Sequence, residues 1–296
     1  MPRLLLALLL TATALVASAG DAWAFCRTTT CKCNSEKTCD TDCPKDENGC
    51  KTTGIPISWT GKCVGFSLNI KGNSNLSADQ WTDALVQSFT AWAAVDCGDG
   101  KHPSIDLKQL RDVVCDKSEF NKTAPNINVI YFSDTGWSGK DIDGTLATTK
   151  VHFNESGEIL DADIAINSAR HDFTVNEQGV SQDLVSVMTH EAGHFLGLDH
   201  SSDPDAVMYF QYSAGSVNRE LRDDDRKAIC TLYPPGRGAT CDPTPLGGFG
   251  DTCPDTKVGC TVSPARGSES GSLVSVAFGI IGLVGLRAVG KRWRMR

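Results

Sequence analysis

Basic charge is scarce in the body of this 296-residue chain, and so are histidine and methionine. Residues 25–265 hold 21 Lys and Arg against 34 Asp and Glu, a net charge of −13. So acidic a body argues against nucleic acid or an anionic lipid surface as its partner. The chain has only six histidines and four methionines, so a segment in which they gather is informative. Its 40% hydrophobic content is sufficient for a sizeable core.

Long apolar runs are confined to the two ends of the chain, and both are short for a membrane span. Residues 1–24 have the pattern of a secretory signal peptide, with Arg3, an apolar run and a final Ala-Trp-Ala. Cleavage is expected after Ala24, with Ala19 as the second choice, and Phe25 before Cys26 does not fit a lipoprotein site. An N-terminal anchor is the alternative. We expect export to the cell surface, the outer membrane or the extracellular space.

The C-terminal end allows two interpretations. Residues 236–272 form a linker and spacer, and residues 273–296 form an apolar helix with a basic end. The helix could be retained as an anchor that contacts the membrane, provided that Arg287 extends its side chain to the interface. Alternatively, the order resembles the tripartite sorting tails of some Gram-negative surface proteins, which makes Cys260 a processing or attachment point.

Cysteine is abundant, and seven of the thirteen cysteines fall within residues 26–63. Residues 25–62 have little apolar periodicity, so we expect disulfides to hold this segment in shape. A zinc cluster is the rival interpretation of Cys31-Lys-Cys33. We further expect pairs Cys97–Cys115 and Cys241–Cys253, and the odd count then leaves one cysteine over.

Residues 63–235 have the pattern of one globular domain. Ser77 and Gln80 form a capping box, and an apolar stripe follows it at helical spacing. Strands and helices mix without strict alternation, which predicts an α/β (α+β) fold with a mixed sheet. Strands are expected at 63–70, 104–110, 126–132, 144–153 and 158–167, and helices at 77–94, from 181 onward and at 222–233; the apolar stripe is Trp81, Leu85, Phe89 and Trp92.

Three histidines cluster in the segment Thr189–Phe210. On a helix, His190 and His194 project from one face and can reach one metal ion. Gly197 suits the left-handed residue that ends a helix, so the chain can turn back and bring His200 to the same ion. Three imidazoles leave Zn²⁺ an open position for water, and the neighbouring Glu191 can take that water's proton.

Met208, which follows the third histidine, adds to this motif and makes it resemble a known protein family. His190–His200 together with Met208 resemble the metzincin proteases, and Ser201 after the third histidine resembles their matrixin branch. Tyr209 directly after Met208 and the paired Asp224 and Asp225 of "LRDDDRKAICTLY" also resemble matrixins. The resemblance implies a twisted mixed sheet with three helices, a methionine turn at Met208, and a cleft that binds an extended peptide against an edge strand. It also implies a substrate-pocket wall at Tyr209, Phe210 and Tyr212.

The sequence departs from vertebrate matrixins in its other metal sites. No Pro-Arg-Cys-Gly latency motif precedes the domain. Thr148 and Asp163 stand where the resemblance places histidines of a second, structural zinc, and His152 and His171 do not fall on those matches. We therefore expect one catalytic zinc. The sequence lacks the histidines that would support a second, structural zinc, and Ca²⁺ at Asp141 and Asp143 is a further cation to consider.

The leading hypothesis is an exported, monomeric zinc endopeptidase that acts on a protein or peptide. The alternative is a non-catalytic metal-binding surface or adhesion protein on the same scaffold, which would not require Glu191. A third interpretation, compatible with the first, makes residues 26–62 a cap or propeptide over the cleft.

Overall fold

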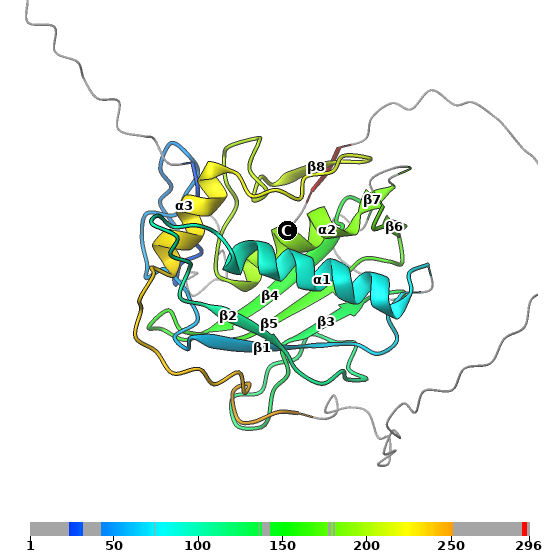
Figure 1. Cartoon of the computed structure of the whole chain (residues 1–296), viewed down its shortest axis with the longest axis horizontal. Coiled ribbons are helices and arrows are strands. Elements are labelled where there is room, and N and C mark those ends of the chain that lie inside the picture. The colour runs from blue at the N-terminus through cyan, green and yellow to red at the C-terminus, as the bar shows by residue number, and fades with distance from the viewer. Residues whose placement is uncertain are drawn as a thin grey trace, which may run out of the picture.

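The computed structural model describes residues 24–31, 43–73, 75–135, 137, 143–176, 179, 181–250 and 292–294 (Figure 1). Residues 1–23 of the expected signal peptide, residues 273–291 of the expected C-terminal helix and its basic end, Cys253 and Cys260 lie outside these ranges. Within the described ranges, no helix is long and apolar enough to cross a membrane.

A five-stranded mixed sheet forms the base of the domain, in the order β2-β1-β3-β5-β4. Its neighbours are parallel except for β4 and β5, which pair antiparallel from Ala147 opposite Ile166 to Phe153 opposite Ile159. The expected mixed α/β sheet is therefore confirmed, and β4 is an edge strand. The strands are β1 Cys63–Leu68, β2 Asp106–Gln109, β3 Val129–Phe132, β4 Ala147–Phe153 and β5 Ile159–Ile166.

Three helices accompany the sheet: α1 Ala78–Ala93, α2 Leu184–Phe195 and α3 Asp223–Leu232. The capping box of α1 is present, because Gln80 N donates to Ser77 Oγ at 3.2 Å and Ser77 N donates to Gln80 Oε1 at 3.0 Å. Helices α1 and α2 lie side by side over the same face of the sheet (Figure 1). The four residues of the expected apolar stripe are buried in the core between them.

Helix α2 begins three residues later than the sequence indicates. Gln182–Asp183 instead form strand β7, which pairs in parallel with β6, Phe173–Thr174. Asp183 then caps the helix, since its side chain accepts a hydrogen bond from Ser186 N at 2.9 Å. A further short pair joins β8, Gln211–Ser213, to β9, Arg292–Arg294.

Disulfides connect parts of the chain that are distant in sequence. Cys97 pairs with Cys230 of α3, 133 residues away, and Cys63 pairs with Cys241, 178 residues away. The expected pairs Cys97–Cys115 and Cys241–Cys253 are therefore wrong. Proximity in sequence suggested them, whereas the fold places Cys97 beside α3 and Cys241 beside the start of β1.

The N-terminal segment is cross-linked as expected, by Cys26–Cys50 and Cys31–Cys43. It packs against the loop that follows α2. Thr28 N donates to Gly197 O at 3.0 Å, and Asp199 N donates to Cys26 O at 3.0 Å. The Cys26–Cys50 disulfide also brings Lys51 to within 3.7 Å of the Asp199 carboxylate. This segment therefore supports the loop that carries His200.

Candidate metal centre

Two backbone carbonyl groups outside helix α2 orient its two histidine rings and fix their tautomers. His190 Nδ1 lies 2.7 Å from Val207 O, and His194 Nδ1 lies 2.9 Å from Leu198 O. A carbonyl oxygen can only accept, so each Nδ1 carries the hydrogen and each Nε2 is left with a lone pair. Burial lowers the pKa of both rings, and the neighbouring histidines lower that of His190 further. Both imidazoles are thus held in the neutral form that binds metals.

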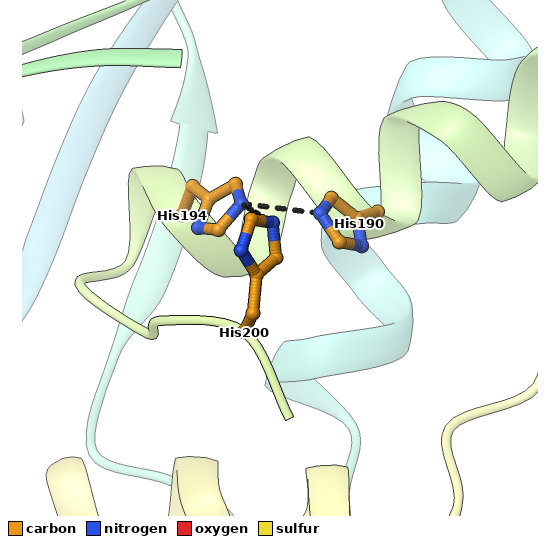
Figure 2. A group of neighbouring side chains, drawn as sticks. All are labelled: His190, His194 and His200. Atoms are coloured by element: carbon orange, nitrogen blue, oxygen red, sulfur yellow. Dashed lines mark hydrogen bonds between the residues drawn. The ribbon is translucent and has the colours of Figure 1, made fainter. Parts of the chain in front are cut away.

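A tight turn brings the third histidine to the other two. Gly197 has a φ of +98°, and a Cβ there would stand 2.5 Å from Ile57 O. This position accepts only glycine because the conformation and the space both exclude a side chain. The chain reverses there, and His200 projects from the loop toward His190 and His194 on α2 (Figure 2).

The spacing of the ring nitrogens matches a single ion. His194 Nε2 lies 3.1 Å from His190 Nε2 and 3.2 Å from His200 Nε2. Two ligands of a tetrahedral zinc with bonds of about 2.0–2.1 Å are roughly 3.3 Å apart. Lone pairs facing one another at this distance repel unless a cation stands between them. Among the described residues, these three histidines form the one group of three or more His, Cys, Asp or Glu side chains whose ligand atoms lie close enough to hold a metal ion.

Glu191 lies next to this cluster and is fully buried. Its Oε2 accepts a hydrogen bond of 2.5 Å from Thr149 Oγ1 on β4, and its Oε1 has no hydrogen-bond partner in the described structure. Burial raises the pKa of Glu191 to about 8, against the opposing effect of the Thr149 hydrogen bond. The metal-free site therefore favours a proton on this carboxyl group. The sequence did not indicate Thr149, since no motif connects it to α2.

The segment around Met208 is anchored by α3. Asp225 is buried, and its carboxylate accepts hydrogen bonds from Val207 N at 2.8 Å and Met208 N at 3.1 Å. Asp224 accepts a hydrogen bond from Ser201 Oγ at 2.6 Å. The paired aspartates thus fix the methionine turn and the residue after His200, and Val207 O in turn orients His190.

Gly193 is where α2 touches the methionine turn. A Cβ at this position would stand 2.3 Å from Met208 Sδ and 3.0 Å from the Trp92 ring. We expect Gly193→Ala to lower the free energy of unfolding by about 1–3 kcal/mol, because Met208 must move within a packed core. Urea unfolding of the metal-free protein measures this effect, with Ala91→Gly at a half-buried position of α1 as a comparison for the glycine–alanine difference in a helix. An unchanged midpoint would show that Met208 repacks freely.

The three residues expected in the substrate-pocket wall differ from one another in burial. Tyr212 is buried, and its hydroxyl accepts a hydrogen bond from Asp183 N at 3.0 Å and donates to Ser216 O at 2.5 Å. Tyr209 and Phe210 keep part of their surface exposed, and the Phe210 ring centroid lies 6.3 Å from that of His200. Tyr212 therefore supports the loop, while Tyr209 and Phe210 remain available to a ligand.

The other residues considered for metals are apart from this centre. Asp163 is buried and accepts a hydrogen bond from Val129 N at 2.9 Å, and the His152 ring stacks on Phe120 at 4.6 Å. His171 is buried beside Phe173. In the loop considered for calcium, Asp143 lies 3.7 Å from Arg170 Nε, and Asp141 is outside the described residues. Thr148 is half-buried on β4.

The fold and the three-histidine cluster together define a candidate metalloprotein on a mixed α/β scaffold. Comparison with known families then places it: the chain belongs to the matrixin family, whose model matches residues 58–234.

Curated relatives agree with this placement. Metalloendoproteinase 1-MMP of Arabidopsis thaliana is 33% identical over 113 residues, which are 38% of this chain and 31% of that protein. Matrilysin of Felis catus is 41% identical over 91 residues, which are 30% of this chain and 32% of that protein. Metalloendoproteinase 2-MMP of Arabidopsis thaliana is 32% identical over 168 residues, which are 54% of this chain and 42% of that protein. The chain thus spans about a third of the length of the first two.

Proposed function

We propose that this protein is an exported zinc endopeptidase. The observation that carries the proposal is the convergence of three imidazole Nε2 atoms beside the buried carboxyl group of Glu191. The family supports it, because matrixin relatives such as 1-MMP bear the name metalloendoproteinase. The disulfides of the N-terminal segment support export, since they form in oxidising compartments.

Each residue of the site has a role in this proposal. His190, His194 and His200 hold the ion. Zinc, when bound there, supplies a Lewis acid that lowers the pKa of a water molecule and polarises the scissile carbonyl. Glu191 accepts the proton of the attacking water on a carboxylate oxygen and transfers it to the leaving amine nitrogen, so that the C–N bond breaks without a charged leaving group.

The substrate we propose is an extended stretch of protein or peptide that pairs with the free edge of β4. The edge position of β4 and its contact with Glu191 through Thr149 support this choice. Tyr209 and Phe210 would line the pocket for the side chain that follows the scissile bond. We place the protein at the cell surface or outside the cell, as a monomer whose C-terminal tail contacts the membrane.

The test is a combined measurement of zinc content and peptide cleavage on the purified full chain. We expect about one zinc per chain, cleavage of an unbiased peptide library, loss of cleavage with a chelator and its recovery when zinc is added back. Peptides read by mass spectrometry also give the cleavage preference. A zinc-loaded chain that cleaves nothing would favour the non-catalytic surface protein, and a folded chain that binds no zinc would contradict both proposals.

A further inference from the structure

The hydroxyl group of Thr149 contacts the carboxylate of Glu191. Thr149 lies within β4, paired with Ile164 of β5, and its side chain reaches across to α2. Thr149 Oγ1 donates to Glu191 Oε2 at 2.5 Å and lies 3.2 Å from the carbonyl oxygen of the same residue. The Thr149 hydroxyl therefore links strand β4 to the Glu191 side chain and backbone of helix α2.

The two carboxylate oxygens of Glu191 have unequal surroundings. Oε2 is bound to Thr149, while Oε1 is buried and has no hydrogen-bond partner in the described structure. A glutamate has three rotatable bonds, so helix position alone does not fix its carboxylate. A threonine has few χ1 states because it is branched at Cβ, and the antiparallel ladder with β5 holds its backbone. The donor is thus more rigid than the group that it binds.

We propose that Thr149 is a positioning residue for Glu191. By holding Oε2, it leaves Oε1 as the oxygen that faces the reacting water. The inference rests on the proposed function, because it assigns the orientation of the same general base. It also connects the two halves of the site, since the strand that would pair with the substrate is the strand that sets the carboxylate. Substrate held by β4 and the base held by Thr149 are then in a fixed relation.

A purely structural role for Thr149 predicts a different pattern of effects. If the hydroxyl only satisfied a buried carboxyl group, its loss would lower stability and leave the turnover of the folded enzyme unchanged. If Thr149 acted by binding substrate at the strand edge, its loss would raise KM. A positioning role lowers kcat at an unchanged KM, because the carboxylate is needed only in the transition state.

The experiment compares Thr149→Val, which removes the hydroxyl at nearly constant shape, with Thr149→Ser, which retains it. We expect Thr149→Val to lower kcat about 10- to 100-fold at a KM within about twofold, a size typical of residues that orient the groups of a metal site. Thr149→Ser is expected to stay within about threefold of the wild type. Zinc content and the thermal midpoint are measured for each variant, and Thr149→Ala replaces the valine variant if that one does not fold.

A double-mutant cycle with Glu191→Gln completes the test. In that background Thr149→Val is expected to have no further effect on the residual rate, because the group that it positions is already gone. Equal kcat in wild type and Thr149→Val would overturn the inference, and so would an equal loss in the valine and serine variants or a loss confined to KM. If the wild type itself binds zinc but cleaves nothing, the proposed function fails first. If the wild type cleaves peptides and all Thr149 variants cleave them equally well, the proposed function stands and this inference alone fails.

Discussion

Replacing Glu191 with Gln is expected to lower kcat/KM for peptide cleavage by about 10²- to 10⁴-fold, while about one zinc per chain remains bound. The amide has the shape of the carboxyl group but cannot accept a proton from the attacking water. The side chain is fully buried, so no external base can readily take its place. His190, His194 and His200 are unchanged in this variant, and their convergence does not depend on the Glu191 side chain.

Zinc analysis and steady-state kinetics on the same preparation separate catalysis from metal binding. Glu220→Gln is the matched control, because Glu220 is exposed beside α3 and lies 3.8 Å from Arg222. We expect the control to keep its activity within about twofold of the wild type. Wild-type turnover in the Glu191→Gln variant would remove the general base from the mechanism. Loss of zinc in that variant would instead mean that Glu191 helps to hold the ion.

The parts of this protein that depend on local pattern could be predicted from the sequence. The capping box at Ser77 and the helical stripe of α1 are statements about residues three and four apart, and both are present. The strands expected at 144–153 and 158–167 followed from residue pattern alone, and the structure has them as β4 and β5. The convergence of His190, His194 and His200 followed from helix geometry and one glycine, Gly197, which has the expected positive φ.

The parts that depend on long-range contacts could not be predicted. Cys97 has Cys115 closer in sequence, but α3 brings Cys230 to it. Helix α2 begins later than expected because Gln182–Asp183 pair with β6, and no local sequence pattern predicts a strand of two residues. The contact of Thr149 with Glu191 is visible only in the three-dimensional structure. The alternation of side chains along a strand gives the face of β4 on which Thr149 lies, but not the residue of α2 that it contacts.

Asp161 of β5 is another residue whose surroundings the sequence did not reveal. We expect the stability of the protein to depend on the charge of its carboxyl group. Its side chain is fully buried, and neither carboxylate oxygen has a hydrogen-bond partner in the described structure. Burial raises its pKa from the ordinary 3.8 to about 7, although Lys150 lowers it. Asp163, two residues on, is also buried, and burial together with the Asp161 charge raises its pKa. His152 lies opposite Asp161 in β4, and burial lowers the pKa of its ring.

The sign of the pH effect follows from these directions. Between pH 3.8 and about 7 the unfolded chain has lost the Asp161 proton, while the folded chain still binds it. The folded state therefore takes up a proton, and its stability falls as pH rises through this range. A pKa raised from 3.8 to about 7 corresponds to about 4 kcal/mol. Asp161→Asn, which stays neutral at every pH, should lose this dependence.

Urea unfolding of wild type and Asp161→Asn between pH 4 and pH 7.5, both in chelator, measures the difference. We expect the wild type to lose about 4 kcal/mol relative to the variant across this range, and Asp83→Asn on the exposed face of α1 to run parallel to the wild type. Parallel curves for wild type and Asp161→Asn would mean that water or local rearrangement solvates the ionised carboxylate. Repeating the series with Ca²⁺ in place of the chelator distinguishes a third outcome. If calcium stabilises the wild type at pH 7.5 and leaves Asp161→Asn unaffected, the carboxylates of Asp161 and Asp163 bind a cation. The loss of stability with rising pH is then a property of the calcium-free protein alone.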